Sequence, residues 1–355
     1  MLGTALTVLL AALPLPLTEK VSSITFTCVA KAKAGFQAFG GIGGVTYAGG
    51  NRWWMASEGL PLIFPVWLDL TESKLRPRIG KPITIQGDPR REEFKKVESL
   101  ALCHHQFVIG TEAVMAKQLK SGRDQDQRVI FTDLQGRYKG ELVLPEHYQR
   151  KGPKIGSVYY RGIQGLSCSP DGRQLLVSLQ HPLQQDGNIA LSRQLLYRWN
   201  SVQKKYLLDR EFALKLELEL GLMDSALLGN GAALMLENEV KPQQRNTLWS
   251  FQVEDGDDIK GCISLRDCQV RSPSKTLVMD HIERYAGIDL AANELQYDAL
   301  GVGPTLLDGR RTLLLVNDDD HCGTLTNPTA SISPGFAGTT FTRILVPALD
   351  PGEHR

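Results

Sequence analysis

The chain has 355 residues, of which 42% are apolar, so it is long enough to bury the core of one large domain or of two ordinary ones. Its 40 basic residues nearly balance its 39 acidic residues, and the formal net charge is +1. Because a balanced chain offers no broad positive field for nucleic acid or for an anionic membrane surface, we expect neither as a partner.

The first apolar segment runs from Ala5 to Leu17. It is shorter than the about 20 residues that a helix needs to cross a bilayer, but its length suits the apolar part of a secretory signal. No Lys or Arg precedes it, and no clear small-x-small cleavage site follows. We therefore predict a signal peptide or N-terminal hydrophobic segment over residues 1–22, a periplasmic or secreted protein, and no transmembrane span in the mature chain. A buried first strand, or a start codon assigned too far downstream, would also explain this segment.

Short antiparallel strands are predicted for the rest of the chain. In GIQGLSCSPDGRQLLVSLQ (162–180), two runs of strand character flank the turn Pro170-Asp171-Gly172, which predicts a β-hairpin. Similar hairpins recur at irregular intervals, at 40–58, 97–112, 222–239 and 297–320. Further strand-like runs lie between them, at 128–145, 194–200 and 247–253.

A hairpin followed by one or two more strands, repeated five or more times, is typical of a β-propeller, which also avoids long exposed sheet edges. We therefore predict an all-β fold, a β-propeller of six blades, with five to seven compatible with the pattern and the sixth in the irregular region 256–289. Residues 23–350 would form this single domain and residues 351–355 a tail. The closing strand, 341–349, would pair beside residues 23–30 in the first blade. Two β-sandwiches of roughly 150 residues each are the alternative.

Three phrases resemble blades of the phytase-like family, also described as "esterase-like activity of phytase". They are FGGIGGVTYAGGNRWWMASE (39–58), GIQGLSCSPDGRQLLVSLQHPL (162–183) and DALGVGPTLLDGRRTLLLVNDDD (298–320). The resemblance covers about residues 39–349, and DGRRTLLLV followed by Asn-Asp is its most specific element. It implies a β-propeller, export from a bacterial cell and a distant relation to calcium-dependent propeller phytases. Because one fold can host many activities, it implies the fold more strongly than the chemistry.

Each hairpin carries polar residues near the start of its first strand and just after the end of its second. Antiparallel pairing brings both places to the same edge of the sheet, and in a propeller that edge surrounds one mouth of the central channel. The pairs are Gly43 with Glu58, Glu98 with Glu112, Gln164 with Gln180, Asp224 with Glu237, and Asp298 with Asp318. Four blades thus offer carboxylates to one rim.

Crowded carboxylates raise one another's pKa unless a cation lies among them, and several oxygen ligands suit calcium better than zinc or magnesium. We therefore predict a calcium site formed by Glu58, Glu98, Glu112, Asp224, Glu237, Asp298 and Asp318. Of these, Glu98, Asp224 and Asp298 rank highest, because each matches the acid that opens a blade in the family. The alternative for each acid is a solvated turn residue.

Substrate-binding residues are predicted beside these acids: Gln164, Gln180 and Arg161. Other basic residues in or before the hairpins could bind phosphate charge, namely Arg52, Arg90, Arg91, Lys95 and Lys96. Relatives usually have Glu at both polar positions of blade three, where this chain has Gln, and Gly43 lacks a polar side chain altogether. These departures weaken the case for a full calcium cluster.

Other motifs give weaker indications of a functional site. Cys103-His104-His105 indicates a turn, because adjacent residues on a strand point to opposite faces. Of the six cysteines, Cys262 and Cys268 are close enough to bridge across a turn, although spacing alone does not establish a disulfide. The sequence contains no G-x-S-x-G, H-E-x-x-H, P-loop or dinucleotide fingerprint, so a serine-esterase mechanism has no nucleophile elbow.

Two hypotheses about function follow. The first is an exported, monomeric hydrolase that uses calcium at the channel mouth to cleave a small-molecule phosphoester. The second is a non-catalytic propeller that presents the same mouth to a protein or a small ligand. Loss of charge in blade three favours the second hypothesis, whereas the acids kept in blades two, four and five favour the first.

Overall fold

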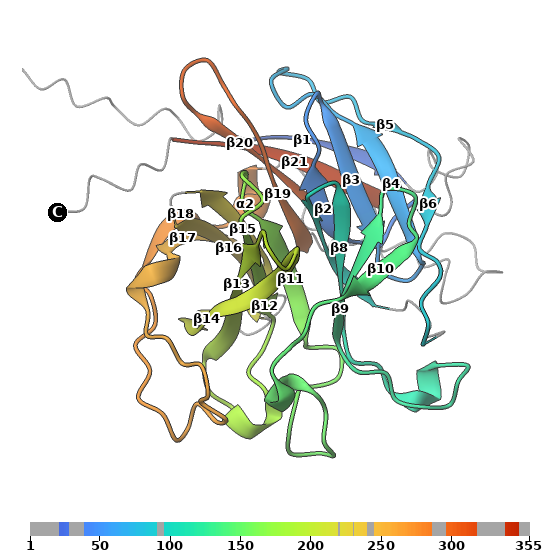
Figure 1. Ribbon diagram of the computed structural model, residues 1–355. Helices are drawn as coiled ribbons and strands as arrows, with labels where there is room; N and C mark the ends of the chain where they lie inside the picture. The colour runs from blue at the N-terminus through green and yellow to red at the C-terminus, as the bar shows by residue number, and fades with distance from the viewer. Residues whose placement is uncertain are drawn as a thin grey trace, which may run out of the picture.

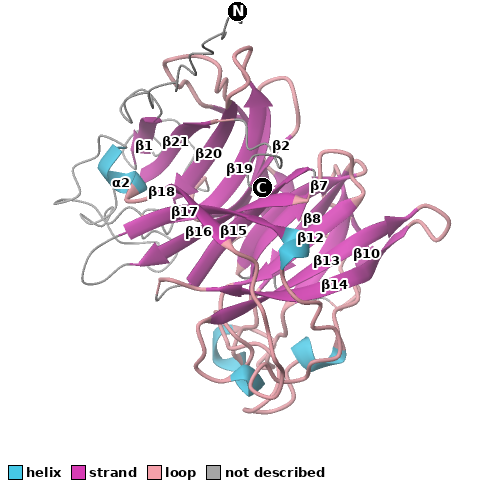
Figure 2. Cartoon of the chain, turned by 90° about the vertical axis from the view of Figure 1, so that its left-hand side faces the viewer, coloured by secondary structure: helices cyan, strands magenta, loops and turns pink. Residues whose placement is uncertain are grey.

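The computed structural model describes residues 21–27, 39–90, 96–218, 221–229, 231–239, 245–285, 296–317 and 338–347. Its strands form five antiparallel sheets, four of them with four strands and one with five. The innermost strands of the five sheets contact one another in a closed ring, and each sheet continues outward from it (Figure 1). Figure 2 shows that the short helices lie in connecting loops. The predicted all-β propeller is therefore confirmed, but it has five blades, and the prediction of six is wrong.

Blades 1 to 3 are built from consecutive strands. Blade 1 consists of β2 (Ile42–Tyr47), β3 (Arg52–Ser57), β4 (Leu62–Trp67), β5 (Arg78–Ile79) and β6 (Ile83–Thr84). Blade 2 consists of β7 (Val97–Cys103), β8 (Gln106–Thr111), β9 (Arg128–Asp133) and β10 (Tyr138–Glu141). Blade 3 consists of β11 (Ile163–Cys168), β12 (Gln174–Leu179), β13 (Leu191–Asn200) and β14 (Lys205–Lys215). Their loops contain the 3-10 helices η2 (Ala116–Gln118), η3 (Glu146–Tyr148) and η4 (Gln184–Asp186).

Blade 4 includes part of the region that was predicted to be a sixth blade. It consists of β15 (Gly221–Gly229), β16 (Ala232–Glu239), β17 (Arg245–Gln252) and β18 (Lys275–Met279), and α2 (Ile282–Tyr285) follows. Between β17 and β18, residues 253–274 form a long loop that begins with η5 (Val253–Asp255). The loop packs on blade 3, where Ile259 donates its backbone N–H to the Glu211 carbonyl (2.8 Å) and contacts Ala213. Because residues 256–274 lack the alternation of apolar residues that a blade needs, this region supplies one outer strand only.

Blade 5 is built from both ends of the chain. It consists of β19 (Tyr297–Thr305), β20 (Arg311–Asn317), β21 (Gly338–Val346) and, outermost, β1 (Val21–Thr27). β1 pairs antiparallel with β21, and Figure 1 shows blue β1 beside red β21. The predicted pairing of the first and last strands is thus confirmed over the described residues, but their sheet is the last blade and not the first. This pairing closes the ring.

Apolar side chains fill the space between neighbouring blades. Between blades 5 and 1, Phe39, Trp53, Phe64 and Phe341 are almost completely buried, and the rings of Phe39 and Phe64 meet edge to face with centroids 5.2 Å apart. The indole Nε1 of Trp53 donates to the Leu68 carbonyl at 3.1 Å, so its polar group is also satisfied. Burying each such side chain contributes on the order of 2–3 kcal/mol, and this packing holds the inner strands in place.

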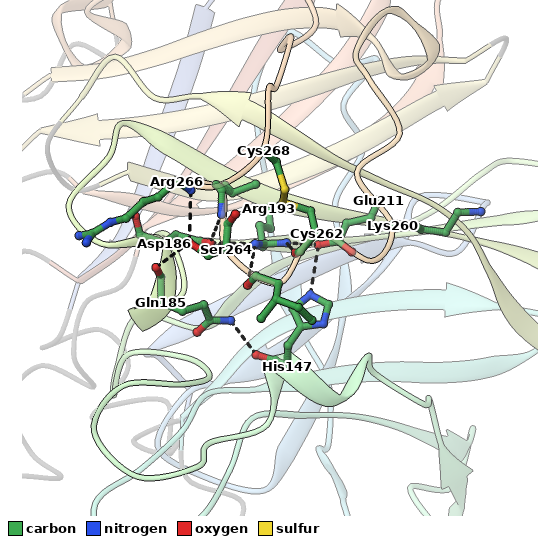
Figure 3. Close-up of a disulfide and its surroundings, with 12 residues drawn as sticks. His147, Gln185, Asp186, Arg193, Glu211, Lys260, Cys262, Ser264, Arg266 and Cys268 are labelled. Atoms are coloured by element: carbon green, nitrogen blue, oxygen red, sulfur yellow. Dashed lines mark hydrogen bonds and ion pairs between the residues drawn. A yellow bond between two sulfur atoms is a disulfide. The ribbon is translucent and has the colours of Figure 1, made fainter.

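A buried ion cluster joins blade 3 to the loop 253–274. Arg193 of β13 is fully buried, and its Nε and Nη2 donate to the two carboxylate oxygens of Asp186, each at 2.8 Å. Its Nη1 donates to the Glu211 carboxylate and to the Cys262 carbonyl, the latter at 2.9 Å. Figure 3 shows Arg193 close to Asp186 and to the disulfide between Cys262 and Cys268. The arginine therefore connects two blades through charge-assisted hydrogen bonds.

Two disulfides lie in the described part of the chain. Cys103 and Cys168 join the ends of β7 and β11, which are the inner strands of blades 2 and 3. Cys262 and Cys268 close a short loop, as their spacing permits. Cys28 and Cys322 lie outside the described residues. In the described ranges, no helix is long and apolar enough to cross a bilayer.

Replacing both Cys262 and Cys268 by serine is expected to lower the free energy of unfolding by about 2 kcal/mol, because a cross-link that closes a short loop restricts the unfolded chain by roughly that amount. Urea unfolding of the variant and of the oxidised wild type measures the difference. An unchanged unfolding midpoint would mean that the contacts of Arg193 hold the loop without help from the disulfide.

Candidate functional site

All five inner strands are irregular at the same place. Each carries a β-bulge near its first residue, where two residues face one residue of the neighbouring strand. In blades 1, 2, 3 and 5 the extra residue of the bulge is the first position of the predicted pair, namely Gly43, Glu98, Gln164 and Asp298. In blade 4 the extra residue is Met223, and Asp224 follows it. A bulge changes the direction of a side chain and is frequent beside functional sites. Gly43, Glu98, Gln164 and Asp298 thus lie at one level of the ring of inner strands, and Asp224 lies one residue further along its strand.

Gly43 has no side chain at this level because there is no space for one. A Cβ atom at Gly43 would lie 2.5 Å from the Val97 carbonyl oxygen and 2.9 Å from the Glu98 Cα. Both distances are shorter than a carbon atom tolerates. The backbone of β2 therefore packs directly on the bulge of β7, and the missing acid of blade 1 has a steric reason.

Side chains from blades 1, 2 and 3 meet around Glu98. The carboxylate of Glu98 accepts a hydrogen bond from Gln164 Nε2 at 3.2 Å, and it is 5% exposed. Lys96 Nζ lies 3.5 Å from Glu98 Oε1 and forms an ion pair with Glu58 as well. One cation of the chain itself thus lies between two of the predicted calcium ligands.

Glu112 completes this group. Its side chain is buried and accepts a hydrogen bond from the backbone N–H of Gly162 at 3.0 Å. Burial and, next, the charge of Glu98 raise the pKa of Glu112 well above its ordinary value, while Lys96 and Arg161 act in the opposite direction. Glu98 and Glu112 therefore resist carrying two negative charges together, and an added cation would relieve this repulsion. We call Glu58, Lys96, Glu98, Glu112, Arg161 and Gln164 the mouth cluster.

Asp224 and Asp298 form a second group, in blades 4 and 5. The carboxylate of Asp224 accepts hydrogen bonds from the backbone N–H groups of Ser225 and Leu300, each at 2.7 Å. Burial raises the pKa of Asp224 well above its ordinary value, and the charge of Asp298 adds to the effect. Asp298 itself is buried and accepts a hydrogen bond from Gln296 Nε2 at 3.0 Å. Both oxygens of Asp224 are thus engaged, and the one that accepts from Leu300 joins blade 4 to blade 5.

Glu237 has its own partners. It is fully buried, lies 3.2 Å from Lys275 Nζ and accepts the backbone N–H of Glu217 at 2.9 Å. Burial raises the pKa of Glu237, and the nearby Lys275 opposes the shift. Gln180 donates to the Met223 sulfur at 3.5 Å. Asp318 lies outside the described residues.

The predicted acids of the described residues therefore fall into three separate places: Glu58, Glu98 and Glu112 lie together, Asp224 and Asp298 form a pair, and Glu237 lies with Lys275. Among the described residues, no group of three or more His, Cys, Asp or Glu side chains has the arrangement that would hold a metal ion. The assignment of these acids as calcium ligands stays a prediction.

Of the basic residues, Arg161 and Lys96 lie with the carboxylates. Arg161 Nη1 is 2.9 Å from His181 Nε2, and this histidine was not predicted, although it directly follows Gln180 in the sequence. Arg90 forms an ion pair with Glu141 at 3.0 Å, and Arg52 lies over the ring of Trp54. Arg91 and Lys95 lie outside the described residues.

The predicted turn at Cys103-His104-His105 is confirmed. His104 and His105 have positive φ angles of 47° and 60°, between β7 and β8. The ring of His104 lies 4.2 Å from that of Trp199, so it packs on blade 3. This arrangement gives the histidine a packing role.

Residues 37–321 match the family described as phytase-like, "Esterase-like activity of phytase". The chain belongs to this family. The resemblance found in the sequence is thus confirmed, and it covers the blades that form the mouth cluster. A comparison with curated proteins gives no match.

Solved structures match this phytase-like chain at low similarity. The PQQ-bound aldose sugar dehydrogenase of Streptomyces coelicolor is 8% identical, with a TM-score of 0.39, 92% of this chain covered and 99% of that one. A putative oxidoreductase (glucose dehydrogenase) of Thermus thermophilus is 9% identical, with a TM-score of 0.37 and coverages of 85% and 96%. The tricorn protease is 12% identical, with a TM-score of 0.36, and the match covers 76% of this chain but 23% of that one. Similarity at this level says nothing about function.

Replacing Glu112 by glutamine is expected to raise the melting temperature at pH 7, in the presence of EDTA, by about 2 °C. The raised pKa of Glu112 means that the folded state favours the protonated form of this side chain. The contribution of Glu112 to stability is therefore complete below pH 4.5, its ordinary pKa, and is lost as the pH rises through its pKa in the folded state. Glutamine keeps an acceptor for Gly162 without the charge. Thermal unfolding between pH 4 and 8, with Glu254→Gln at an exposed position as the control, tests this. A gain that does not vary with pH would contradict the assigned cause.

Proposed function

We propose that this phytase-like protein is an exported hydrolase that binds calcium at the mouth cluster and cleaves a small-molecule phosphoester. The observation that carries the proposal is the meeting of Glu58, Glu98 and Glu112 from neighbouring blades, with Lys96 and Arg161 beside them. This arrangement combines hard oxygen donors for a cation with basic groups for an anion. Family membership supports the same reading.

The donor set fits calcium in its chemistry. Glu98 and Glu112 supply carboxylates whose mutual repulsion a divalent cation would relieve. Glu58 of the adjacent blade 1 and Asp298 of blade 5 would be further donors. Asp224, Glu237 and Asp318 stay in the proposed ligand set, although Asp224 and Glu237 are already hydrogen-bonded to other groups. When bound, calcium would supply positive charge that draws electron density from a phosphoryl group.

The chain's own residues would bind and orient the substrate. Lys96 exchanges its carboxylate partners for a phosphate oxygen once a cation neutralises Glu58 and Glu98. Arg161 pairs with a second phosphate oxygen, and the side-chain amides of Gln164 and Gln180 donate hydrogen bonds to uncharged or anionic oxygens. Gln164 and Gln180 are buried, which would strengthen their contacts with a bound substrate.

We also propose that the protein is exported from the cell and is a monomer. Disulfides persist mainly in oxidising compartments, so the two bridges are consistent with a periplasmic or secreted protein. The apolar segment from Ala5 to Leu17 would then act as the signal.

A second candidate is a propeller that binds a ligand at the mouth cluster without catalysis. Two features favour it: Gln164 and Gln180 carry no charge, and Lys96 already forms ion pairs with Glu58 and Glu98. Such a protein would recognise an anion or a peptide through Lys96 and Arg161 and would need no calcium.

One experiment separates the two candidates. The melting temperature of the wild type is measured in EDTA, magnesium and calcium, and turnover is screened with inositol phosphates and simple aryl phosphates. The hydrolase predicts that calcium raises the melting temperature and that chelation abolishes turnover. Stabilisation by calcium with no turnover on any phosphoester would favour the binding protein, and the absence of both effects would overturn the calcium proposal.

A further inference from the structure

The central channel widens at its other mouth into a cavity of about 400 Å³, lined by residues from all five inner strands. These strands run from their bulges toward this second mouth, so the lining begins two residues beyond each bulge in four of the blades, with Val45, Leu100, Leu166 and Leu300. The carboxylate of Asp224, bound to the Leu300 N–H, lies at the level of this apolar ring. The cavity is therefore a separate space from the mouth cluster.

The wall of this cavity is mixed in character and carries one charge. Beyond the apolar ring lie small and hydroxyl side chains, including Thr46 and Ser167. Arg311, at the start of β20, is the single charged residue among the described residues that line the cavity, and no acidic residue lines it. The volume of this cavity lies within the range of small-molecule sites, and its polar groups lie beside an apolar surface.

Arg311 has a hydrogen-bond partner but no ion-pair partner among the described residues. Its Nη1 donates to the Leu228 carbonyl at 2.9 Å, which fixes the side chain against blade 4. Within the described ranges it forms no ion pair, whereas the neighbouring Arg310 is paired with Asp308 at 2.6 Å. A part-buried guanidinium without a counter-charge binds a carboxylate or a similar anion strongly, because its planar fork matches two oxygen atoms.

The rim of the cavity is fixed in place. Cys168 lines the cavity, and its disulfide with Cys103 joins the inner strands of blades 2 and 3 at this mouth. Ser167 Oγ accepts the Leu227 N–H at 2.8 Å, which joins blade 3 to blade 4 at the same level. Because these links cross from blade to blade, little of the wall has to be ordered when a ligand binds.

We infer that this cavity binds a small organic anion, with its charged group on Arg311 and its compact apolar body against the ring of Val45, Leu100, Leu166 and Leu300. The site is distinct from the mouth cluster and needs no metal. The inference does not depend on the proposed hydrolase activity.

Fluorescence titration with 8-anilinonaphthalene-1-sulfonate, followed by displacement with benzoate, tests the inference on the folded wild type. We expect saturable binding, displacement by benzoate and no displacement by the uncharged benzamide. Arg311→Met should weaken binding by about 10-fold or more, since a charge-assisted pair is lost. Thr46→Phe, which fills the cavity without changing its charge, should weaken it to a similar extent.

Arg310→Met is the matched control, because Arg310 adjoins Arg311 but does not line the cavity, and it should bind like the wild type. Glu98→Gln should leave this binding unchanged, since the mouth cluster is a separate site. Circular dichroism confirms that each variant is folded. The inference is overturned if the wild type shows no saturable binding that benzoate displaces, or if Arg311→Met retains wild-type affinity. Loss of binding in Thr46→Phe but not in Arg311→Met would refute an anionic ligand.

Discussion

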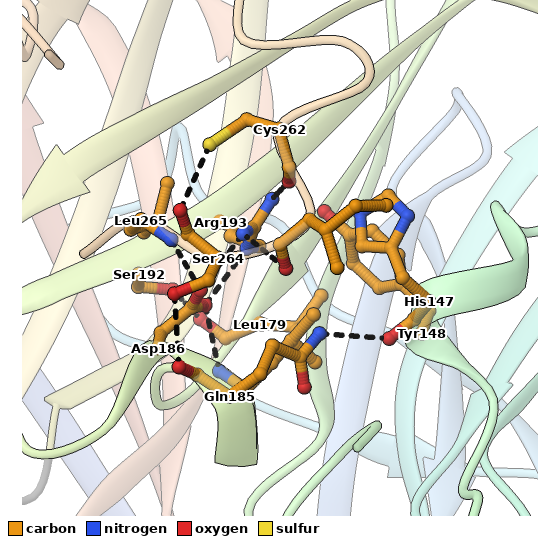
Figure 4. Close-up of polar contacts among 12 residues, drawn as sticks. His147, Tyr148, Leu179, Gln185, Asp186, Ser192, Arg193, Cys262, Ser264 and Leu265 are labelled. Atoms are coloured by element: carbon orange, nitrogen blue, oxygen red, sulfur yellow. Dashed lines mark hydrogen bonds and ion pairs between the residues drawn. The ribbon is translucent and has the colours of Figure 1, made fainter. Parts of the chain in front are cut away.

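Replacing Arg193 by methionine is expected to lower the free energy of unfolding by about 3–5 kcal/mol, because removing one partner of a buried ion pair leaves uncompensated charge in the interior. Asp186 and Glu211, which Arg193 neutralises, are both almost completely buried. Figure 4 shows Arg193 among Asp186, Ser264 and Cys262, in contact with side chains and carbonyl groups from different segments. Tyr148 also donates to Glu211, at 2.6 Å. Loss of Arg193 would therefore loosen blade 3 from the loop 253–274.

Arg198→Met is the matched control for this prediction. Arg198 lies on the same strand, β13, but its ion pair with Asp209 is largely exposed, so its loss should cost no more than about 1 kcal/mol. Urea unfolding of both variants against the wild type measures the difference. Equal, small losses for the two arginines would show that the buried cluster contributes little to the stability of the fold.

Replacing Glu98 by glutamine is expected to abolish the stabilisation by calcium and to lower phosphoester turnover by about 100-fold or more, because it removes the charge at the centre of the mouth cluster. Asp298→Asn should have the same effect if blade 5 contributes a ligand. Both changes preserve the size of the side chain, and glutamine can still form a hydrogen bond with Gln164. The melting temperature in calcium and in EDTA, together with initial rates, provides the two measurements.

Glu254→Gln removes one charge at an exposed position outside the mouth cluster and serves as the control. It should retain the calcium response and the turnover of the wild type. A normal calcium response in Glu98→Gln would remove Glu98 from the site, and a normal response in Asp298→Asn would remove Asp298 from it.

Local features of the sequence predict the inner hairpins well. The turn Pro170-Asp171-Gly172 separates two strands of matching length, and Gly172 has the positive φ angle, 73°, that such turns require. The repeated position predicted at the start of each inner strand coincides with the extra residue of a bulge in blades 1, 2, 3 and 5, and in blade 4 it directly follows that residue. Both features depend on contacts between neighbouring residues, and so they are visible in a single sequence.

The number of blades depends on contacts that local sequence does not encode. The region 256–289 has a suitable length for a blade, but its loop is held by Arg193, which is a contact across blades, and is closed internally by the disulfide of Cys262. The composition of the first strand does not indicate which blade the strand joins. Its place in blade 5 follows from the closure of the ring.

Prediction of the site from the sequence is limited in the same way. The sequence predicts acids at one rim, and the structure places Glu98 beside Glu112 and Lys96. It does not predict that Asp224 uses both oxygens to bind backbone N–H groups, because one of these belongs to another blade. The absence of an acid at Gly43 looks like a loss of function in the sequence, whereas the structure gives it a packing reason.

The most direct measurement of the central claim is titration calorimetry of the wild type with calcium chloride at pH 7.5, after treatment with EDTA and its removal. We predict saturable binding of at least one calcium ion per chain, lost in Glu98→Gln and retained in Glu254→Gln. The absence of saturable binding in the wild type, or equal binding in Glu98→Gln, would contradict the claim that the mouth cluster is a calcium site.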